Sequence, residues 1–184
     1  YSDLQLFTFV NTGGLPTQVL TNASVAEVYG MEAEMDWQAT EQMGIRLGVG
    51  LLESELQDYQ SVTGDDFSGN ELPQSPGYSV AGLVYYDIPL NSGAVITLQT
   101  DFSYQDDVFF LNDNNPLLSQ EAYGLVNARV SFRTASENFE LALWGKNLAG
   151  EDYLSAAFDL SDFGLYQLMR GADTTYGAEV TYRF

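Results

Sequence analysis

The sequence contains neither cysteine nor histidine. Disulfide bonds, Cys/His metal sites and catalytic arrangements built on a Ser–His or Cys–His pair are therefore excluded. Basic residues are also scarce, with six Lys plus Arg against 26 Asp plus Glu. This balance argues against a nucleic-acid partner, because a nucleic-acid surface attracts positive charge. No metal and no cofactor is predicted.

Long hydrophobic runs are missing as well. The longest run without a polar or charged residue, counting Tyr as apolar, extends only from Val80 to Tyr86. A spanning helix needs about 18 to 20 apolar residues, so none is predicted. The chain begins at Tyr1 without the form of a signal peptide, which indicates a fragment or a processed product. Aromatic residues are plentiful (12 Tyr, 11 Phe and two Trp), which argues against a disordered acidic chain.

Alternation with period two recurs along the chain and predicts β-strands. In the clearest segment Ile96, Leu98, Phe102 and Tyr104 share one face, and polar residues occupy most positions between them. Successive side chains of a strand point to opposite faces, so such a segment has one apolar and one polar face. Eight strands are predicted, at residues 1–10, 23–37, 44–57, 77–87, 93–106, 122–134, 138–148 and 172–184.

The connections between these strands alternate in length. Residues 38–43, 88–92 and 135–137 are short connections, whereas 11–22, 58–76, 107–121 and 149–171 are long ones. In an up-and-down antiparallel order, alternate connections lie at opposite ends of the sheet. Short turns at one end and long loops at the other are typical of outer-membrane β-barrels. A soluble β-sandwich, with alternate residues facing its core, is the competing interpretation of the alternation.

Several segments resemble the C-terminal half of TonB-dependent receptors, in the expected order along the chain. They are Ala26-Glu27-Val28-Tyr29-Gly30-Met31-Glu32-Ala33-Glu34, Gly69-Asn70-Glu71-Leu72-Pro73-Gln74-Ser75-Pro76, Tyr123-Gly124-Leu125-Val126-Asn127-Ala128-Arg129, Leu143-Trp144-Gly145-Lys146-Asn147-Leu148 followed by Tyr153, and the terminal Tyr182-Arg183-Phe184. The predicted fold is therefore all-β: about eight C-terminal strands of an antiparallel, up-and-down transmembrane β-barrel. The resemblance implies a barrel of 22 strands.

The resemblance also implies a function. Such receptors sit in the outer membrane of Gram-negative bacteria and take up scarce nutrients with energy from the TonB complex. Iron–siderophore complexes are the commonest cargo, and cobalamin, haem and carbohydrates are others. Residues 1–184 would be the C-terminal part of the barrel, with the plug domain and the TonB box upstream of this chain. The alternative is a self-sufficient eight-stranded barrel with a structural or adhesive role.

Cargo contacts are predicted in the long connections. Aromatic rings beside carboxylates can hold a sugar or an amphipathic chelate by stacking and hydrogen bonding, although loop aromatics also pack a loop against itself. The candidates are Tyr104, Asp106, Asp107, Phe109, Phe110, Phe158, Asp159, Asp162, Phe163, Tyr166 and Arg170. Residues 112–115 and 65–66 are rich in Asn and Asp and suit calcium, but a turn role is preferred.

Two further patterns complete the predictions. Tyr176, Val180, Tyr182 and Phe184 resemble the C-terminal signal that engages the barrel-assembly machinery, and they would also suit a lipid-facing aromatic girdle. Carboxylates at 32, 34 and 36 form a ladder that would line a solvated interior with cross-strand ion pairs to later arginines, or would contact a plug. No carboxylate pair or nucleophile motif indicates an enzyme. A glycosidase or a soluble carbohydrate-binding module remains only as a contrasting alternative.

Overall fold

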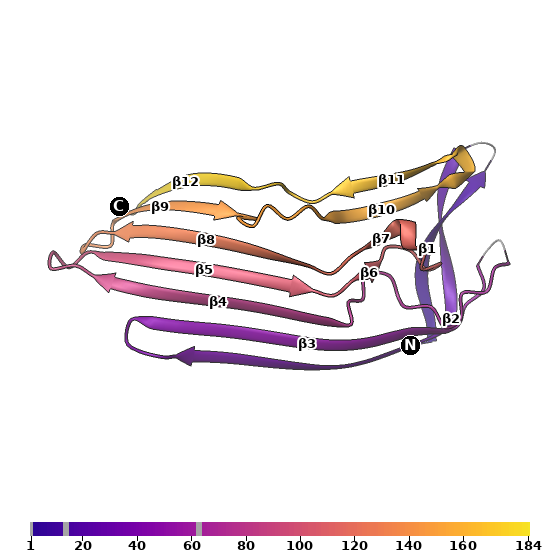
Figure 1. Ribbon diagram of the computed structural model, residues 1–184, viewed down its shortest axis with the longest axis horizontal. Helices are drawn as coiled ribbons and strands as arrows, with labels where there is room; N and C mark the ends of the chain where they lie inside the picture. The colour runs from indigo at the N-terminus through magenta and orange to yellow at the C-terminus, as the bar shows by residue number, and fades with distance from the viewer. Residues whose placement is uncertain (1, 13–14, 62–63) are drawn as a thin grey trace.

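The computed structural model describes residues 2–12, 15–61 and 64–184 (Figure 1). Eight long strands form one antiparallel sheet in chain order. They are β1 (Ser2–Thr12), β2 (Leu15–Gln38), β3 (Met43–Asp58), β4 (Tyr78–Pro89), β5 (Val95–Gln105), β8 (Tyr123–Arg133), β9 (Phe139–Lys146) and β12 (Thr175–Tyr182). Among the described residues, no helix is both long and apolar enough to cross a membrane.

The longer connections contain smaller elements. Two short hairpins are formed by β6 (Val108–Phe109) with β7 (Ser119–Gln120) and by β10 (Leu154–Leu160) with β11 (Leu165–Arg170), and the 3-10 turns are η1 (Pro116–Leu118) and η2 (Ser161–Phe163). The predicted loops at 107–121 and 149–171 are thus ordered hairpins. Figure 1 shows the short turns and the C-terminus at one end of the sheet, and these hairpins at the other.

The predicted long connection at residues 11–22 is wrong. β1 continues to Thr12 and β2 begins at Leu15, and the two strands pair from Thr12↔Leu15 back to Ser2↔Val25. The sequence carried the signal, because two consecutive glycines separate the strands and Gly-Gly marks a hairpin. The polar residues of this segment suggested a loop, yet Thr and Val favour extended backbone even outside an apolar layer.

The strand register confirms the apolar and polar faces, since directly paired residues share a face. One such row consists of Tyr86, Leu98, Val130, Leu143 and Ala178 on five successive strands. The register also shows which face of β4 is apolar and which is polar, an assignment that the sequence alone does not give. Val80 pairs with Tyr104 on the apolar face, so Ser79 and Ala81 lie on the polar face.

Within the described residues, no second layer of protein covers the apolar face. Large side chains such as Met31, Leu143 and Val180 are 65%, 59% and 64% exposed. A soluble sandwich would bury them, whereas the outside of a membrane barrel presents them to lipid. The buried apolar clusters instead lie beside the long connections, around Leu56 and around Leu118.

The strands from β2 to β12 form an open wall, and β1 pairs with Leu15–Val25 of β2, the part of β2 that extends beyond its pairing with β3 (Figure 1). In the described part of the chain, β12 pairs only with β9, and β1 pairs only with β2. Residues 26–38 of β2 pair with β3 but have no partner strand on their other edge among the described residues. Unpaired backbone groups are costly in hydrocarbon, so further strands are needed to complete a barrel.

Candidate ligand-binding surface

Three long connections extend from the end of the sheet opposite the C-terminus (Figure 1). We call their described residues the first loop (59–61 and 64–77), the second loop (106–122) and the third loop (147–174). Their sequences contain twelve carboxylates and a single basic residue, Arg170. Arg170 forms an ion pair with Asp152 at 3.3 Å, and both side chains are exposed. The loop end of the sheet is therefore strongly negative.

Four of the predicted cargo-contact residues lie in the second loop, but not all of them face solvent. They are Asp106, Asp107, Phe109 and Phe110. Phe110 is buried, 8% exposed, and packs with Leu118 and with Ala157 of the third loop. Phe109 is half-buried, and its carbonyl accepts a hydrogen bond from the Gln74 amide at 2.8 Å. Phe110 thus helps to build the surface, while Phe109 remains accessible for contact.

Asp106 and Asp107 follow β5 directly. Asp106 is half-buried, and its amide donates to the Tyr78 carbonyl at 2.9 Å, which ties the loop to the start of β4. Asp107 is exposed. Of the two carboxylates, Asp107 has the freer approach to solvent.

Tyr104 lies apart from the other candidates. Its ring stacks on Tyr78 with centroids 5.8 Å apart, on the apolar face of the sheet. Tyrosines at the edge of an apolar band suit an interfacial girdle, with the ring in lipid and the hydroxyl near water. We therefore leave Tyr104 out of the surface proposed for cargo.

The third loop carries its candidates on the β10–β11 hairpin and the turn that joins the two strands. Asp159 pairs with Tyr166 across the hairpin, so their side chains share a face, and Phe158 lies on the other face. Asp162 is exposed, and Phe163 and Tyr166 are 40% and 42% exposed. These two rings are the most accessible aromatic side chains among the candidates in the loops.

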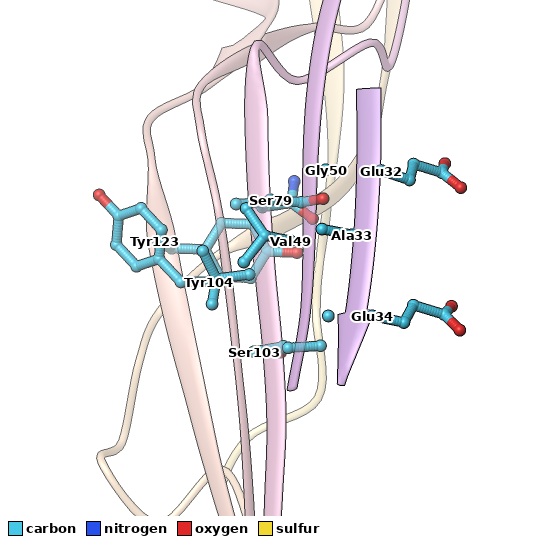
Figure 2. A pocket seen from close by; sticks show the side chains of 13 residues that line it. Glu32, Ala33, Glu34, Val49, Gly50, Ser79, Ser103, Tyr104 and Tyr123 are labelled. Carbon is cyan, nitrogen blue, oxygen red and sulfur yellow. The ribbon is translucent and has the colours of Figure 1, made fainter. Parts of the chain in front are cut away.

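A shallow hollow of about 330 Å³ lies across β2, β3, β4, β5 and β8, near the ends of these strands that lead into the loops (Figure 2). Its lining takes residues from both faces of the sheet. Glu32, Glu34, Ser103 and Tyr123 belong to the polar face, and Ala33, Val49, Val80 and Tyr104 belong to the apolar face. Figure 2 shows the two glutamates projecting from one side of β2, with Ala33 on the other side.

Below the hollow, the polar face is crossed by ion pairs between strands. Asp36 and Arg46 are 3.0 Å apart, and Arg129 contacts Glu140 at 3.0 Å and Glu179 at 3.7 Å. The Arg129 and Glu140 side chains are only 28% and 21% exposed. Cross-strand pairs thus occur on this face, but not with the predicted partners. Within the described residues, Asp36 of the ladder pairs with Arg46 of the adjacent strand, and Arg129 pairs with Glu140 and Glu179 instead of with the ladder.

In the Asn/Asp-rich segments, the side chains of Asp66, Asp113 and Asn115 bond their own turns, whereas Asn114 bonds Glu71 of the first loop. Ser68 donates its amide and hydroxyl to Asp66, and these hydrogen bonds lower the pKa of that carboxyl. Asp113 accepts from the Asn115 amide at 3.3 Å, and burial is the main cause that raises the pKa of Asp113. In the described part of the chain, no group of three or more acidic side chains is placed to hold a metal ion. The turn interpretation fits these contacts.

The predicted assembly-signal residues lie together on the apolar face of β12 and just beyond it. Tyr176, Val180 and Tyr182 are 74%, 64% and 55% exposed, and Phe184 is fully exposed. The Tyr182 and Phe184 rings meet edge to face, with centroids 5.0 Å apart. The arrangement suits both roles predicted for them, a girdle and a recognition edge.

Sequence reasoning missed the amide side chains that hold the loops. Asn147 is 4% exposed and has a left-handed backbone, with φ of 49°. Its side chain bonds Glu151 and Ala172, which lie in the two stems of the third loop. The available signal was its place directly after a strand, inside the Trp-Gly-Lys-Asn-Leu segment, where Asn tolerates positive φ.

These features define a class of protein: part of the wall of a membrane β-barrel with its loops at one end. The family model for the TonB dependent receptor-like β-barrel matches residues 1–148. The chain therefore belongs to this family, whose members are outer-membrane receptors of Gram-negative bacteria and not enzymes.

Solved receptors have the same fold. The ferric yersiniabactin uptake receptor FyuA from Yersinia pestis is 20% identical, with a TM-score of 0.77 over 90% of this chain and 25% of its own. The ferric preacinetobactin receptor BauA from Acinetobacter baumannii is 20% identical, with a TM-score of 0.68 over 98% and 25%. The siderophore receptor PiuA from the same species is 18% identical, with a TM-score of 0.67 over 85% and 22%. The chain spans about a quarter of the length of these receptors.

Proposed function

We propose that this chain is the C-terminal part of the barrel of a receptor for TonB-dependent active uptake of a scarce nutrient, an iron–siderophore complex. Its strands supply barrel wall in contact with outer-membrane lipid, and its three loops supply part of the extracellular cargo surface. Coupling to the TonB complex would use the plug and TonB box, upstream of this chain. The observation that carries the proposal is an exposed apolar face joined to ordered loops at one end only.

The alternative, a self-sufficient eight-stranded barrel, has less support. Its first and last strands would have to pair with each other, and in the described residues β1 and β12 each pair with one neighbour only. β1 also pairs with β2 no further than Val25, at the loop end of that strand. An open wall fits a larger barrel better.

The charge of the loops narrows the cargo class. Twelve carboxylates against one arginine repel an anionic complex and attract a cationic one at long range. The exposed rings of Phe163 and Tyr166 add stacking surface. We therefore expect a neutral or cationic ferric complex, such as a ferric trihydroxamate, in preference to an anionic ferric catecholate.

Uptake of radioactive iron by cells that carry or lack the full-length gene tests this function. Deletion is expected to abolish uptake from the ferric trihydroxamate, and the Tyr166→Ala/Phe163→Ala receptor is expected to bind it about tenfold more weakly. Leu165→Ala is the matched control, since Leu165 is an exposed apolar side chain of the same hairpin, at 50%. The same deletion strain is also tested with other ferric complexes, cobalamin, haem and oligosaccharides. If uptake of all of them is unchanged, the transport function is refuted.

The barrel-assembly machinery is the further proposed partner, through the exposed aromatic end of the chain. Deletion of Phe184 from the full-length receptor is expected to reduce the folded receptor in the outer membrane about tenfold, because an edge strand is recognised by its backbone and alternate side chains. Phe184→Tyr should restore it. The measurement is the fraction that migrates as a compact barrel on unheated gels. Equal amounts with and without Phe184 would refute this role.

A further inference from the structure

Amide side chains join the first loop to the second. Asn114 accepts from the Glu71 amide through Oδ1 at 2.7 Å and donates to the Glu71 carbonyl through Nδ2 at 3.1 Å. Asn70 donates from Nδ2 to the Asn112 carbonyl at 2.8 Å. Because Asn114 satisfies both backbone groups of one residue, its side chain replaces the partner strand that Glu71 would have in a sheet.

The second loop is joined to the third in a similar way. Gln120 is 8% exposed, and its Oε1 accepts a hydrogen bond from the Leu154 amide. Beside this bond, Phe110 and Leu118 of the second loop pack with Ala157 of the third. Leu118 is completely buried, which is unusual in a surface connection.

We infer that the three loops form one preorganised body, in which Asn114 and Gln120 are positioning residues for the proposed cargo surface. The hydrogen bonds of Asn114 fix the first loop on the second. The hydrogen bond of Gln120 to Leu154, together with the apolar cluster around Leu118, fixes the second loop on the third. Phe109 and Tyr166, on different loops, therefore keep a fixed separation before any cargo arrives.

Such bracing has a physical consequence for binding. Ordering flexible loops on association costs free energy, and a preorganised surface avoids most of this cost. Neighbouring hydrogen bonds that share one small core also open together, as a single cooperative unit. Breaking one inter-loop contact should then loosen a loop that it does not touch.

Hydrogen–deuterium exchange of the full-length receptor in detergent micelles, without cargo, tests this coupling. Asn114→Ala is expected to speed exchange about five- to tenfold at Glu71, and also at Leu154 in the third loop, whose amide bonds Gln120 and not Asn114. Gln120→Ala should likewise speed exchange at both sites: at Leu154, whose amide Gln120 bonds, and at Glu71 in the first loop. Asn114→Asp, which keeps the oxygen acceptor for the Glu71 amide, should fall between wild type and alanine.

Asn115→Ala is the matched control. Asn115 caps η1 by accepting from the Leu117 amide at 3.0 Å, and its amide donates to Asp113 of the same loop. Faster exchange is therefore expected in the second loop alone. Protected amides in β5 verify that each barrel is folded. If Asn114→Ala and Gln120→Ala speed exchange only at the amide each one bonds, the single body is refuted. The inferred role rests on the proposed function, but exchange without cargo and iron uptake are independent measurements, so either can fail alone.

Discussion

Replacing Asn147 with alanine is expected to release the third loop from the barrel, at a cost of about 2 to 4 kcal/mol in the free energy of unfolding. The Asn147 Nδ2 donates to the Glu151 carbonyl at 2.8 Å and to the Ala172 carbonyl at 3.1 Å, and its Oδ1 accepts from the Glu151 amide at 2.9 Å. Alanine removes these three bonds, which close the neck of a loop that leaves β9 and returns to β12.

The backbone at Asn147 adds a second contribution. Its φ of 49° lies in the left-handed region, where alanine costs about 1 kcal/mol and glycine costs nothing. Asn147→Gly therefore loses only the side-chain hydrogen bonds, and stability should follow the order Asn, Gly, Ala. Urea unfolding of the full-length receptor measures the order, and limited proteolysis at residues 151–172 shows where the chain opens. A glycine variant as stable as wild type would show that the three hydrogen bonds contribute nothing.

The strands of the sheet could be predicted from the sequence because a single physical rule sets them. A barrel wall separates lipid from water, so alternate residues must differ in polarity. The prediction for β5 at residues 93–106 therefore lies within two residues of the observed Val95–Gln105. The prediction fails where neighbouring residues do not differ in polarity. β4 has apolar residues on both faces, and only its register with β5 shows which face is which.

The loops could not be predicted in the same way, because contacts between distant residues decide their structure. Nothing local to Asn114 indicates that its amide bonds Glu71, 43 residues away in sequence. Phe110 and Phe109 are equivalent as sequence, yet one is buried against the third loop and the other is half-buried. Tyr104 was grouped with the loop residues although its alternation already placed it on the apolar face.

A large effect within the sheet is expected at Gly44. The ring of Tyr85 lies across this glycine, and a Cβ at residue 44 would sit 2.6 Å from the Tyr85 hydroxyl oxygen. That hydroxyl donates to the Gln38 Oε1 at 2.9 Å, and the side-chain Nε2 of Gln38 donates to the Thr40 and Met43 carbonyls. Gly44→Val must displace the ring, so it should break a link between β2 and β4 and loosen the short turn between β2 and β3.

Gly48 provides the matched control for this prediction, because it lies on the same strand and the same face. A Cβ at residue 48 would meet nothing within 4 Å. Gly44→Val is expected to destabilise the full-length receptor by about 2 to 3 kcal/mol, whereas Gly48→Val should be neutral or stabilising by up to about 1 kcal/mol, because valine favours extended backbone. Urea midpoints of the two variants in detergent measure the difference. Equal stabilities would mean that the Tyr85 ring moves aside at no cost, and that the contact between ring and glycine does not hold this end of the barrel wall together.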